Sequence, residues 1–399
     1  EEGFMSDMKS VNYLKLRAEA GVLGWESYLS PFLYRSAWTG TTGTTFGPSS
    51  LTTRWFGTTN ESTVYRTYPG RTGNPDLSWE KRKEISAGFD ALMFNEKLSL
   101  EMTYYNNLLD GQISQVANSV PYLVGISSAL PRFNYNKTRY YGVEAGIQFN
   151  ESVGDFGYSL GANAVVQNSK LVKYDEPAYR NDYQVRTGRP ADTYFGQTYL
   201  GKFASDAEAL AVPQLYDAVL KAGDLKYKDM NGDGFVDDND MSAIGHTTPR
   251  LYYALNAKLR FKNFDFTVIG TGFAFYDIPL TNKYYWNGWG DNNYSNFVKE
   301  NAGGAYPRLT YYKVNNNFVA SDFWLTKGGY FKIQNVELAY NIPAEKLQII
   351  RSRGMRIFAR GANLLTLSPV KDIDPESTNS GLEMYPLFRT FTGGVKLIF

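Results

Sequence analysis

Residues 251–276 read LYYALNAKLRFKNFDFTVIGTGFAFY, which is two alternating arms around a tight turn at residues 262–263. In the first arm, residues 253–261, every second side chain is apolar, and the positions between them include Lys258 and Arg260. This period of two predicts a β-hairpin with one apolar and one polar face. Each arm has about the 9–11 residues that cross a bilayer as a tilted strand. A soluble β-sandwich shows the same alternation, so the hairpin alone does not separate the two fold classes.

The segment before the hairpin, residues 229–240, reads DMNGDGFVDDND and has the spacing of a calcium-binding loop. Six residues offer oxygen ligands at positions 1, 3, 5, 7, 9 and 12, the fourth of them through its carbonyl: Asp229, Asn231, Asp233, Phe235, Asp237 and Asp240. Gly234 permits the sharp turn between them, and hard oxygen ligands at this spacing suit Ca²⁺. Because position 12 is Asp and not the longer Glu of EF-hands, we expect a weaker site or one that includes a water molecule. The alternative is an acidic, turn-rich surface loop without an ion.

The composition of the 399 residues favours an outer-membrane barrel. The formal charge is +1, so no charge excess points to nucleic acid, and the lack of Cys excludes disulfides. There are 31 Tyr, 25 Phe and 37 Gly, as is typical of barrels with aromatic girdles and tight turns. The mean hydropathy is −0.38, and no apolar run is long enough for a transmembrane helix. Barrel strands need no such run, because only alternate residues are apolar.

The order of the connections decides between barrel and sandwich. Alternating segments are predicted to form strands at about residues 12–24, 84–90, 98–104, 141–150, 156–169, 329–341, 355–360 and 391–399, besides the hairpin. Short turns at residues 94–96, 153–155 and 262–263 alternate with long loops at about residues 107–138, 170–249, 277–328 and 367–387. A transmembrane barrel has short periplasmic turns and long extracellular loops, whereas a sandwich has no reason to separate them. We therefore predict an all-β protein, a transmembrane antiparallel β-barrel with long extracellular loops.

The loops and the N-terminal part are predicted in less detail. Residues 28–67 are expected to hold a strand or two and an outer loop. A short helix is expected after Ser205, where Glu208 completes a capping box, another before Gly223, and a helical turn within residues 343–352.

The alternation also predicts which side chains face lipid and which face the lumen. The residues expected to face lipid are Tyr253, Leu255, Leu259, Phe266 and Leu397. The residues expected to line a wet lumen are Lys15, Arg17, Glu84, Glu144, Lys258, Arg260, Arg356, Arg360 and Lys396. For each charge taken singly, hydration or pairing within the protein is favoured over a ligand contact. Four loop aromatics are candidates to stack on sugars or on a partner: Tyr284, Tyr285, Trp286 and Trp289.

Five stretches resemble one family: NPDLSWEKRKEISAGFD (74–90), KDMNGDGFVDDND (228–240), FKNFDFTVIGTG (261–272), GYFKIQNVELAYNIP (329–343) and RIFARGANLLTLSP (356–369). They are similar to the C-terminal barrel of SusC-like TonB-dependent transporters of Bacteroidota, and the resemblance extends over residues 12–399. It implies that the chain is the C-terminal portion of a barrel of about 22 strands. The N-terminal plug and the TonB-contacting part would lie outside this chain.

The resemblance further implies a location and partners. The family imports bulky nutrients, oligosaccharides or peptides, across the bacterial outer membrane with energy from TonB, under a SusD-like surface lipoprotein. The loops would be extracellular, and the outward face would contact outer-membrane lipid. Phe399 ends an alternating strand, which is how such barrels present their closing strand to the barrel-assembly machinery; the alternative is that this Phe is incidental.

Three functions remain open at this stage. The first is a transporter, and the second is a SusC-like barrel that serves as a scaffold subunit of an outer-membrane assembly or secretion machine. The third, an extracellular enzyme or adhesin with a calcium loop, lacks a catalytic constellation. The single His, His246, is expected in a solvated turn. We therefore expect no enzyme, no catalytic residues and no cofactor other than structural Ca²⁺.

Overall fold

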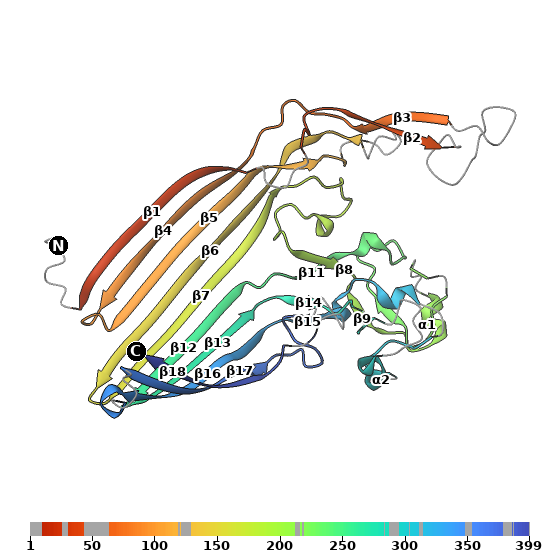
Figure 1. Cartoon of the computed structure of the whole chain (residues 1–399). Helices are drawn as coiled ribbons and strands as arrows, with labels where there is room; N and C mark the ends of the chain where they lie inside the picture. The colour runs from red at the N-terminus through yellow and green to blue at the C-terminus, as the bar shows by residue number, and fades with distance from the viewer. Residues whose placement is uncertain are drawn as a thin grey trace.

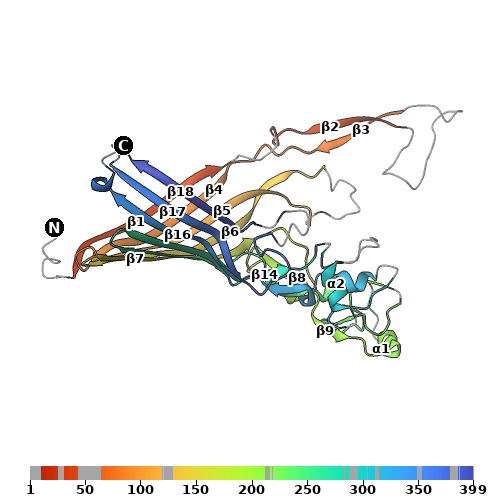
Figure 2. The same cartoon turned by 60° about the horizontal axis from the view of Figure 1, so that its bottom comes forward.

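The computed structural model describes residues 10–25, 31–43, 64–118, 120, 129–211, 216–217, 219–282, 284–286, 295–302, 304–310, 314–347, 353–377, 385 and 387–398. Its main feature is a ten-stranded antiparallel sheet that curves into an open trough (Figures 1 and 2). The strands, in their order across the sheet, are β1 (Val11–Trp25), β4 (Glu80–Met93), β5 (Leu98–Gln115), β6 (Arg132–Val153), β7 (Phe156–Lys173), β12 (Leu251–Phe261), β13 (Phe264–Ala274), β16 (Tyr330–Pro343), β17 (Gly354–Leu367) and β18 (Thr390–Ile398). The large antiparallel sheet confirms the predicted fold class.

The separation of turns and loops is also confirmed. The three predicted turns join β4 to β5, β6 to β7 and β12 to β13, and they lie together at one end of the trough (Figure 1). We call this the turn end and the opposite one the loop end. In the turns, Phe94, Asn95 and Glu96 have φ of 57° to 63°, and Lys262 has φ of 51°. These left-handed conformations allow the chain to reverse within a few residues.

One predicted loop is shorter than expected. β5 and β6 continue to Gln115 and from Arg132, so the loop predicted at residues 107–138 shrinks to residues 116–131. The register between these strands shifts near Asp110 and Gln112. Such a bulge moves the following side chains to the other face, so the period-two pattern ends although the pairing continues.

The long connections hold smaller elements at the loop end. The paired short strands are β2 (Ala37–Gly43) with β3 (Val64–Arg71), β8 (Thr193–Gly196) with β11 (Ser242–His246), β9 (Tyr199–Lys202) with β10 (Leu225–Tyr227), and β14 (Asp277–Pro279) with β15 (Leu325–Lys327). The α-helices are α1 (Asp206–Ala211) and α2 (Asn296–Asn301), and the 3-10 turns of these connections are Asp182–Gln184, Asp238–Asp240, Asn315–Phe318 and Asp322–Trp324. A further 3-10 turn, Ala344–Lys346, follows β16 at the turn end. In the part of the chain described, no helix is long and apolar enough to cross a membrane. We call residues 174–250 and 277–328 together the loop domain.

The helix predictions have mixed outcomes. α1 begins as expected, because the Ser205 hydroxyl accepts a hydrogen bond from the amide of Glu208 at 3.1 Å. The described residues of the helix predicted before Gly223 are not helical, and the rest of that segment lies outside the described residues. The helical turn predicted after Pro343 is confirmed as one 3-10 turn at Ala344–Lys346. Trp289 and Phe399 lie outside the described residues.

Candidate functional site

The two faces of the sheet differ as the alternation predicts. Register places Leu259 beside Phe266, Phe266 beside Leu338, and Leu338 beside Ala359 on one face. The five residues expected to face lipid, from Tyr253 to Leu397, all fall on this face. Side chains on this face remain exposed although neighbouring strands flank them on both sides. Leu338, for example, is 51% exposed.

The opposite face carries charged side chains along the middle of the strands and toward the turn end, many of them in contact with one another. Arg17 donates to Asp90 at 2.8 Å and to the Thr103 hydroxyl at 3.1 Å. Lys258 aligns with Thr267, which aligns with Glu337. The residues expected to line the lumen therefore share one face. On this concave face, four of the expected residues form ion pairs within the sheet: Arg17, Arg260, Arg356 and Arg360.

A network of three arginines and two carboxylates lies on the polar face toward the turn end. Asp265 is almost fully buried and accepts hydrogen bonds from Arg356 at 2.5 Å and Arg260 at 3.3 Å. Arg356 also donates to Glu337 at 2.7 Å, and Arg360 donates to the other oxygen of the same carboxylate. Each carboxylate is thus held by two guanidinium groups, which compensates for its removal from water.

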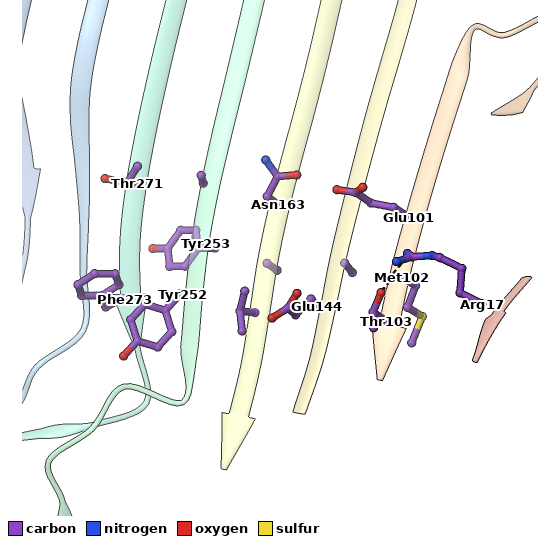
Figure 3. Close-up of a pocket in the computed structure, with 14 residues that line it drawn as sticks. Arg17, Glu101, Met102, Thr103, Glu144, Asn163, Tyr252, Tyr253, Thr271 and Phe273 are labelled. Atoms are coloured by element: carbon purple, nitrogen blue, oxygen red, sulfur yellow. Dashed lines mark hydrogen bonds between the residues drawn. The ribbon is translucent and has the colours of Figure 1, made fainter. Parts of the chain in front are cut away.

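Nearer the middle of the strands, the polar face has a hollow of about 460 Å³ (Figure 3). Its polar and aromatic lining comes from strands on both halves of the sheet: Arg17, Glu101, Thr103, Glu144, Asn163, Tyr252, Thr271 and Phe273. Tyr252 and Phe273 pack edge to face with ring centroids 4.6 Å apart. Carboxylates, an amide and aromatic rings side by side provide hydrogen-bonding and stacking groups for a polar solute.

Glycines on the polar face make room for long side chains of the next strand. A Cβ at Gly146 would lie 2.4 Å from the Glu101 carboxylate and 2.9 Å from the Asn163 amide oxygen. A Cβ at Gly161 would lie 2.2 Å from the Gln148 amide oxygen. Glu101 and Gln148 therefore cross the sheet over glycines, and a larger residue at either position would force them to move.

The loop domain has an aromatic core of its own, which corrects one expectation. Tyr285 is 2% exposed and packs with Tyr306 and Trp324, and Tyr284 and Trp286 are partly buried against the same cluster. The Tyr306 hydroxyl donates to the carbonyl of Tyr285 at 2.8 Å. The expectation that these loop aromatics stack on sugars or a partner is wrong for Tyr285, because its ring is needed to fill the core of a long insertion.

Two distant parts of the loop domain are joined by a buried polar contact. Asp224 is fully buried and accepts two hydrogen bonds from Arg308, at 2.8 and 3.1 Å, and one from the Asn317 amide at 2.9 Å. The amide of Lys221 donates to the same carboxylate at 2.9 Å. The connection after β7 is thus bound to the connection after β13, a pairing that sequence spacing does not reveal.

Hydrogen bonds also join the loop domain to the residues just before the N-terminal end of β12. Asp192 accepts hydrogen bonds from Arg250 at 2.7 Å and from the amide of Thr248 at 2.8 Å. Burial by itself raises the pKa of Asp192, but these hydrogen bonds outweigh it and lower the pKa. The turn expected at His246 is wrong, because this residue ends β11 and its Nε2 lies 2.8 Å from the Phe275 carbonyl oxygen, but its side chain is 35% exposed. Pairing with β8 draws this residue into a strand.

A buried lysine ties the β17–β18 connection to the polar face. Lys332 is 1% exposed, and its Nζ lies 3.1 Å from a Glu376 oxygen and 3.6 Å from an Asp374 oxygen. The Tyr330 hydroxyl donates to Glu376 at 2.9 Å. Sequence reasoning missed Lys332, because the register shift near Asn335 disrupts the alternation that would have placed it inward.

The acidic loop forms a set of tight turns. The Asp229 carboxylate accepts hydrogen bonds from the amides of Gly232 at 2.6 Å and Gly234 at 2.9 Å. The amide of Gly234 is the larger cause of a lowered pKa for Asp229, so this carboxylate is charged at neutral pH. The Asp233 carboxylate accepts from the amide of Phe235 at 2.9 Å, and both glycines have positive φ.

Asp240 has a different environment from the other predicted ligands. It is fully buried, and one carboxylate oxygen accepts from the amides of Met230 at 2.7 Å and Asn231 at 3.2 Å, the other from Asp237 at 2.8 Å. Among the residues described, no group of three or more His, Asp or Glu side chains lies together as a metal cluster. The oxygen donors suit Ca²⁺ chemically, but in this conformation their partners are backbone amides and, for Asp233 and Asp237, also the side-chain amides of Asn231 and Asn239.

Comparisons with known proteins agree with this architecture. No protein-family model matches the chain. The chain is 25% identical over 438 residues to the TonB-dependent receptor P26 of Formosa agariphila, a match that covers 100% of the chain and 41% of the relative. It is 26% identical over 414 residues to the TonB-dependent receptor SusC of Bacteroides thetaiotaomicron, covering 100% of the chain and 39% of the relative.

Among solved structures, the RagAB peptide transporter matches with a TM-score of 0.71 at 17% identity, over 99% of this chain and 42% of that one. The resemblance to SusC-like TonB-dependent transporters is therefore confirmed in sequence and in fold. The chain spans about two fifths of the length of the curated relatives that it matches.

Proposed function

We propose that this chain is part of the barrel wall of a SusC-like TonB-dependent transporter that imports bulky nutrients, oligosaccharides or peptides, across the bacterial outer membrane. The observation that carries the proposal is the division of the curved sheet into two faces. Apolar side chains such as Leu16, Ile85 and Leu255 are exposed on the convex face, which suits lipid. The concave face carries paired charges, which suits a hydrated lumen.

The ends of the trough give the orientation. Barrels of this kind have short turns on the periplasmic side and long loops outside, so the loop domain would be extracellular. Its own aromatic core and the contact between Asp224 and Arg308 give it a fixed surface. We propose that this surface receives a SusD-like lipoprotein, while TonB acts through a part of the protein outside this chain. The protein would be a transporter and not an enzyme.

Uptake by intact cells tests this proposal. Cells that produce the protein would be given fluorescent oligosaccharide and peptide mixtures, with and without functional TonB. We expect TonB-dependent uptake of one class of substrate and co-purification of a surface lipoprotein. Normal lipoprotein binding with no TonB-dependent uptake of either class would instead indicate a scaffold and contradict the transport proposal.

We further propose that the acidic loop binds Ca²⁺ through Asp229, Asn231, Asp233, Asp237 and Asp240 and through the Phe235 carbonyl. The spacing of the donors supports this, as do the turns that Gly232 and Gly234 permit. A carboxylate oxygen that accepts one amide hydrogen bond still has a lone pair for a metal. The role would be structural. The acidic loop is joined to the rest of the loop domain through Gln197, whose side-chain amide donates to the Asp237 carbonyl at 2.6 Å.

Titration of the purified, chelator-treated protein with Ca²⁺ tests the site. We expect one bound ion in the wild type, none in Asp233→Ala, and one in the control Asp238→Asn, which changes a loop carboxylate at a non-ligand position. Loss of the ion should also expose residues 205–240 to protease while the sheet stays folded. If chelation and Asp233→Ala both leave protease sensitivity unchanged, the loop needs no ion.

A further inference from the structure

The convex face has a band of cations at the loop end of β4, β5, β6 and β7. The pairing of the strands aligns these residues in two neighbouring rows across the sheet. The first row is Lys83, Leu108, Arg139 and Lys170, and the second is Lys81, Asp110, Lys137 and Lys173. We call these eight positions the basic band. The alternation places seven of them on the same face as the apolar residues Ile85, Met102 and Val166, farther along the strands. The eighth, Lys173, is aligned with Lys137 by a register shift just after Leu171.

The basic band begins where the apolar surface ends. The row between the two consists of Ile85, Asn106, Tyr141 and Asn168. Toward the turn end, the residues on this face are apolar, for example Met102, Ile147 and Leu160, all of them exposed. An apolar surface bordered by Tyr and Asn, and then by cations, follows the polarity of a bilayer from its hydrocarbon interior to its head groups.

Most of the charge in the basic band is not neutralised. Six cations stand against the single carboxylate of Asp110, which leaves a net charge of +5. Asp110 pairs with Lys83 at 2.6 Å and Lys137 at 2.8 Å. Arg139 and Lys170 are exposed neighbours, and neither has an ion-pair partner within the described residues.

The turn end of the same wall has no such excess. There Lys97 pairs with Glu151 at 2.6 Å, and Lys262 lies 4.0 Å from Asp155, so each cation has its own carboxylate. A general need for charge at the edges of the sheet would produce similar patterns at both ends. The difference indicates that the loop end meets an anionic partner that the turn end does not.

We propose that the basic band binds the phosphate groups of a phosphorylated glycolipid in the outer leaflet. Neighbouring strands lie about 4.8 Å apart, so cations on adjacent strands can grip one phosphate or two on the same head group. Arg139 can hold phosphate oxygens with a two-pronged contact, and Lys170 acts as a point charge. The ligand is a lipid because the band continues the lipid-facing surface. This inference rests on the proposed placement in the outer membrane.

Binding of diphosphorylated lipid A to the membrane-purified protein in detergent tests the inference. The comparison ligand is the same lipid with both phosphates removed. The test variant is Arg139→Gln/Lys170→Gln, and the matched control is Lys97→Gln/Lys262→Gln, which removes two cations at the turn end. We expect the test variant to bind the diphosphorylated lipid about tenfold more weakly than the wild type, and the control to bind it normally.

Equal binding of the two lipids by the wild type would overturn the inference, as would unchanged binding by the test variant. If the test variant does not fold, as judged by heat-dependent mobility on gels, the wild type still decides: its binding must depend on phosphate and weaken with salt. Cell fractionation tests the placement separately. A protein found in the outer membrane without phosphate-dependent binding contradicts this inference alone.

Discussion

Replacing Asp224 with Ala should open the loop domain and leave the sheet folded. Asp224 is fully buried and accepts four hydrogen bonds, two of them from Arg308. Removing one partner of a buried ion pair costs about 3–5 kcal/mol, because the remaining charge is left uncompensated. The Arg308 side chain is 30% exposed and can regain water, so we expect a loss near the lower limit, about 3 kcal/mol.

Hydrogen exchange in detergent measures this loss directly. A change of about 3 kcal/mol raises the population of the open loop domain about a hundredfold, so amides in β9 and β10 should exchange correspondingly faster. Amides of β12 and β13 should keep their protection, which shows that the sheet is intact. Glu208→Gln serves as the control, because its ion pair with Lys226 is partly open to water: the Glu208 side chain is 33% exposed, whereas that of Asp224 is fully buried. If the amides of β9 and β10 exchange equally fast in Asp224→Ala and Glu208→Gln, the contact between Asp224 and Arg308 does not stabilise the loop domain.

Three further outcomes follow from particular contacts. Leu255→Arg should destabilise the barrel by about 2–4 kcal/mol near the bilayer midplane, whereas Asn256→Arg on the polar face should be tolerated, as urea unfolding in lipid vesicles would show; equal effects would contradict the division into faces. Arg250 and a backbone amide lower the pKa of Asp192 in the folded protein. The stabilisation by the Asp192 carboxylate is therefore complete above about pH 4 and is lost as the pH falls through the lowered pKa. Asp192→Asn should remove this pH dependence from the hydrogen-exchange protection of the loop domain. Tyr285→Ala should lower the free energy of unfolding of the loop domain by about 3–5 kcal/mol and increase its proteolysis in the absence of any ligand. If the variant is as stable as the wild type and only binds substrate less well, Tyr285 is not a core residue.

The sequence alone determined the fold class, the strand pairs around the short turns and the two faces of the wall. A strand exposes successive side chains on opposite sides, so an alternating pattern states which face is apolar without knowledge of the neighbours. The positions of Leu255, Lys258, Phe266 and Lys396 follow from this rule. The acidic loop was also visible in the sequence, because its spacing is local, whereas binding of Ca²⁺ by it stays a prediction.

The tertiary structure decided what the long connections do. The burial of Tyr285, the contact of Asp224 with Arg308 and the inward position of Lys332 depend on residues far apart in the chain. The contact between Asp224 and Arg308, for example, spans 84 residues. The basic band likewise becomes visible only when the register aligns Lys83, Arg139 and Lys170 across separate strands. No local period encodes such contacts, because folding of a long insertion is determined by which distant groups can exclude water together.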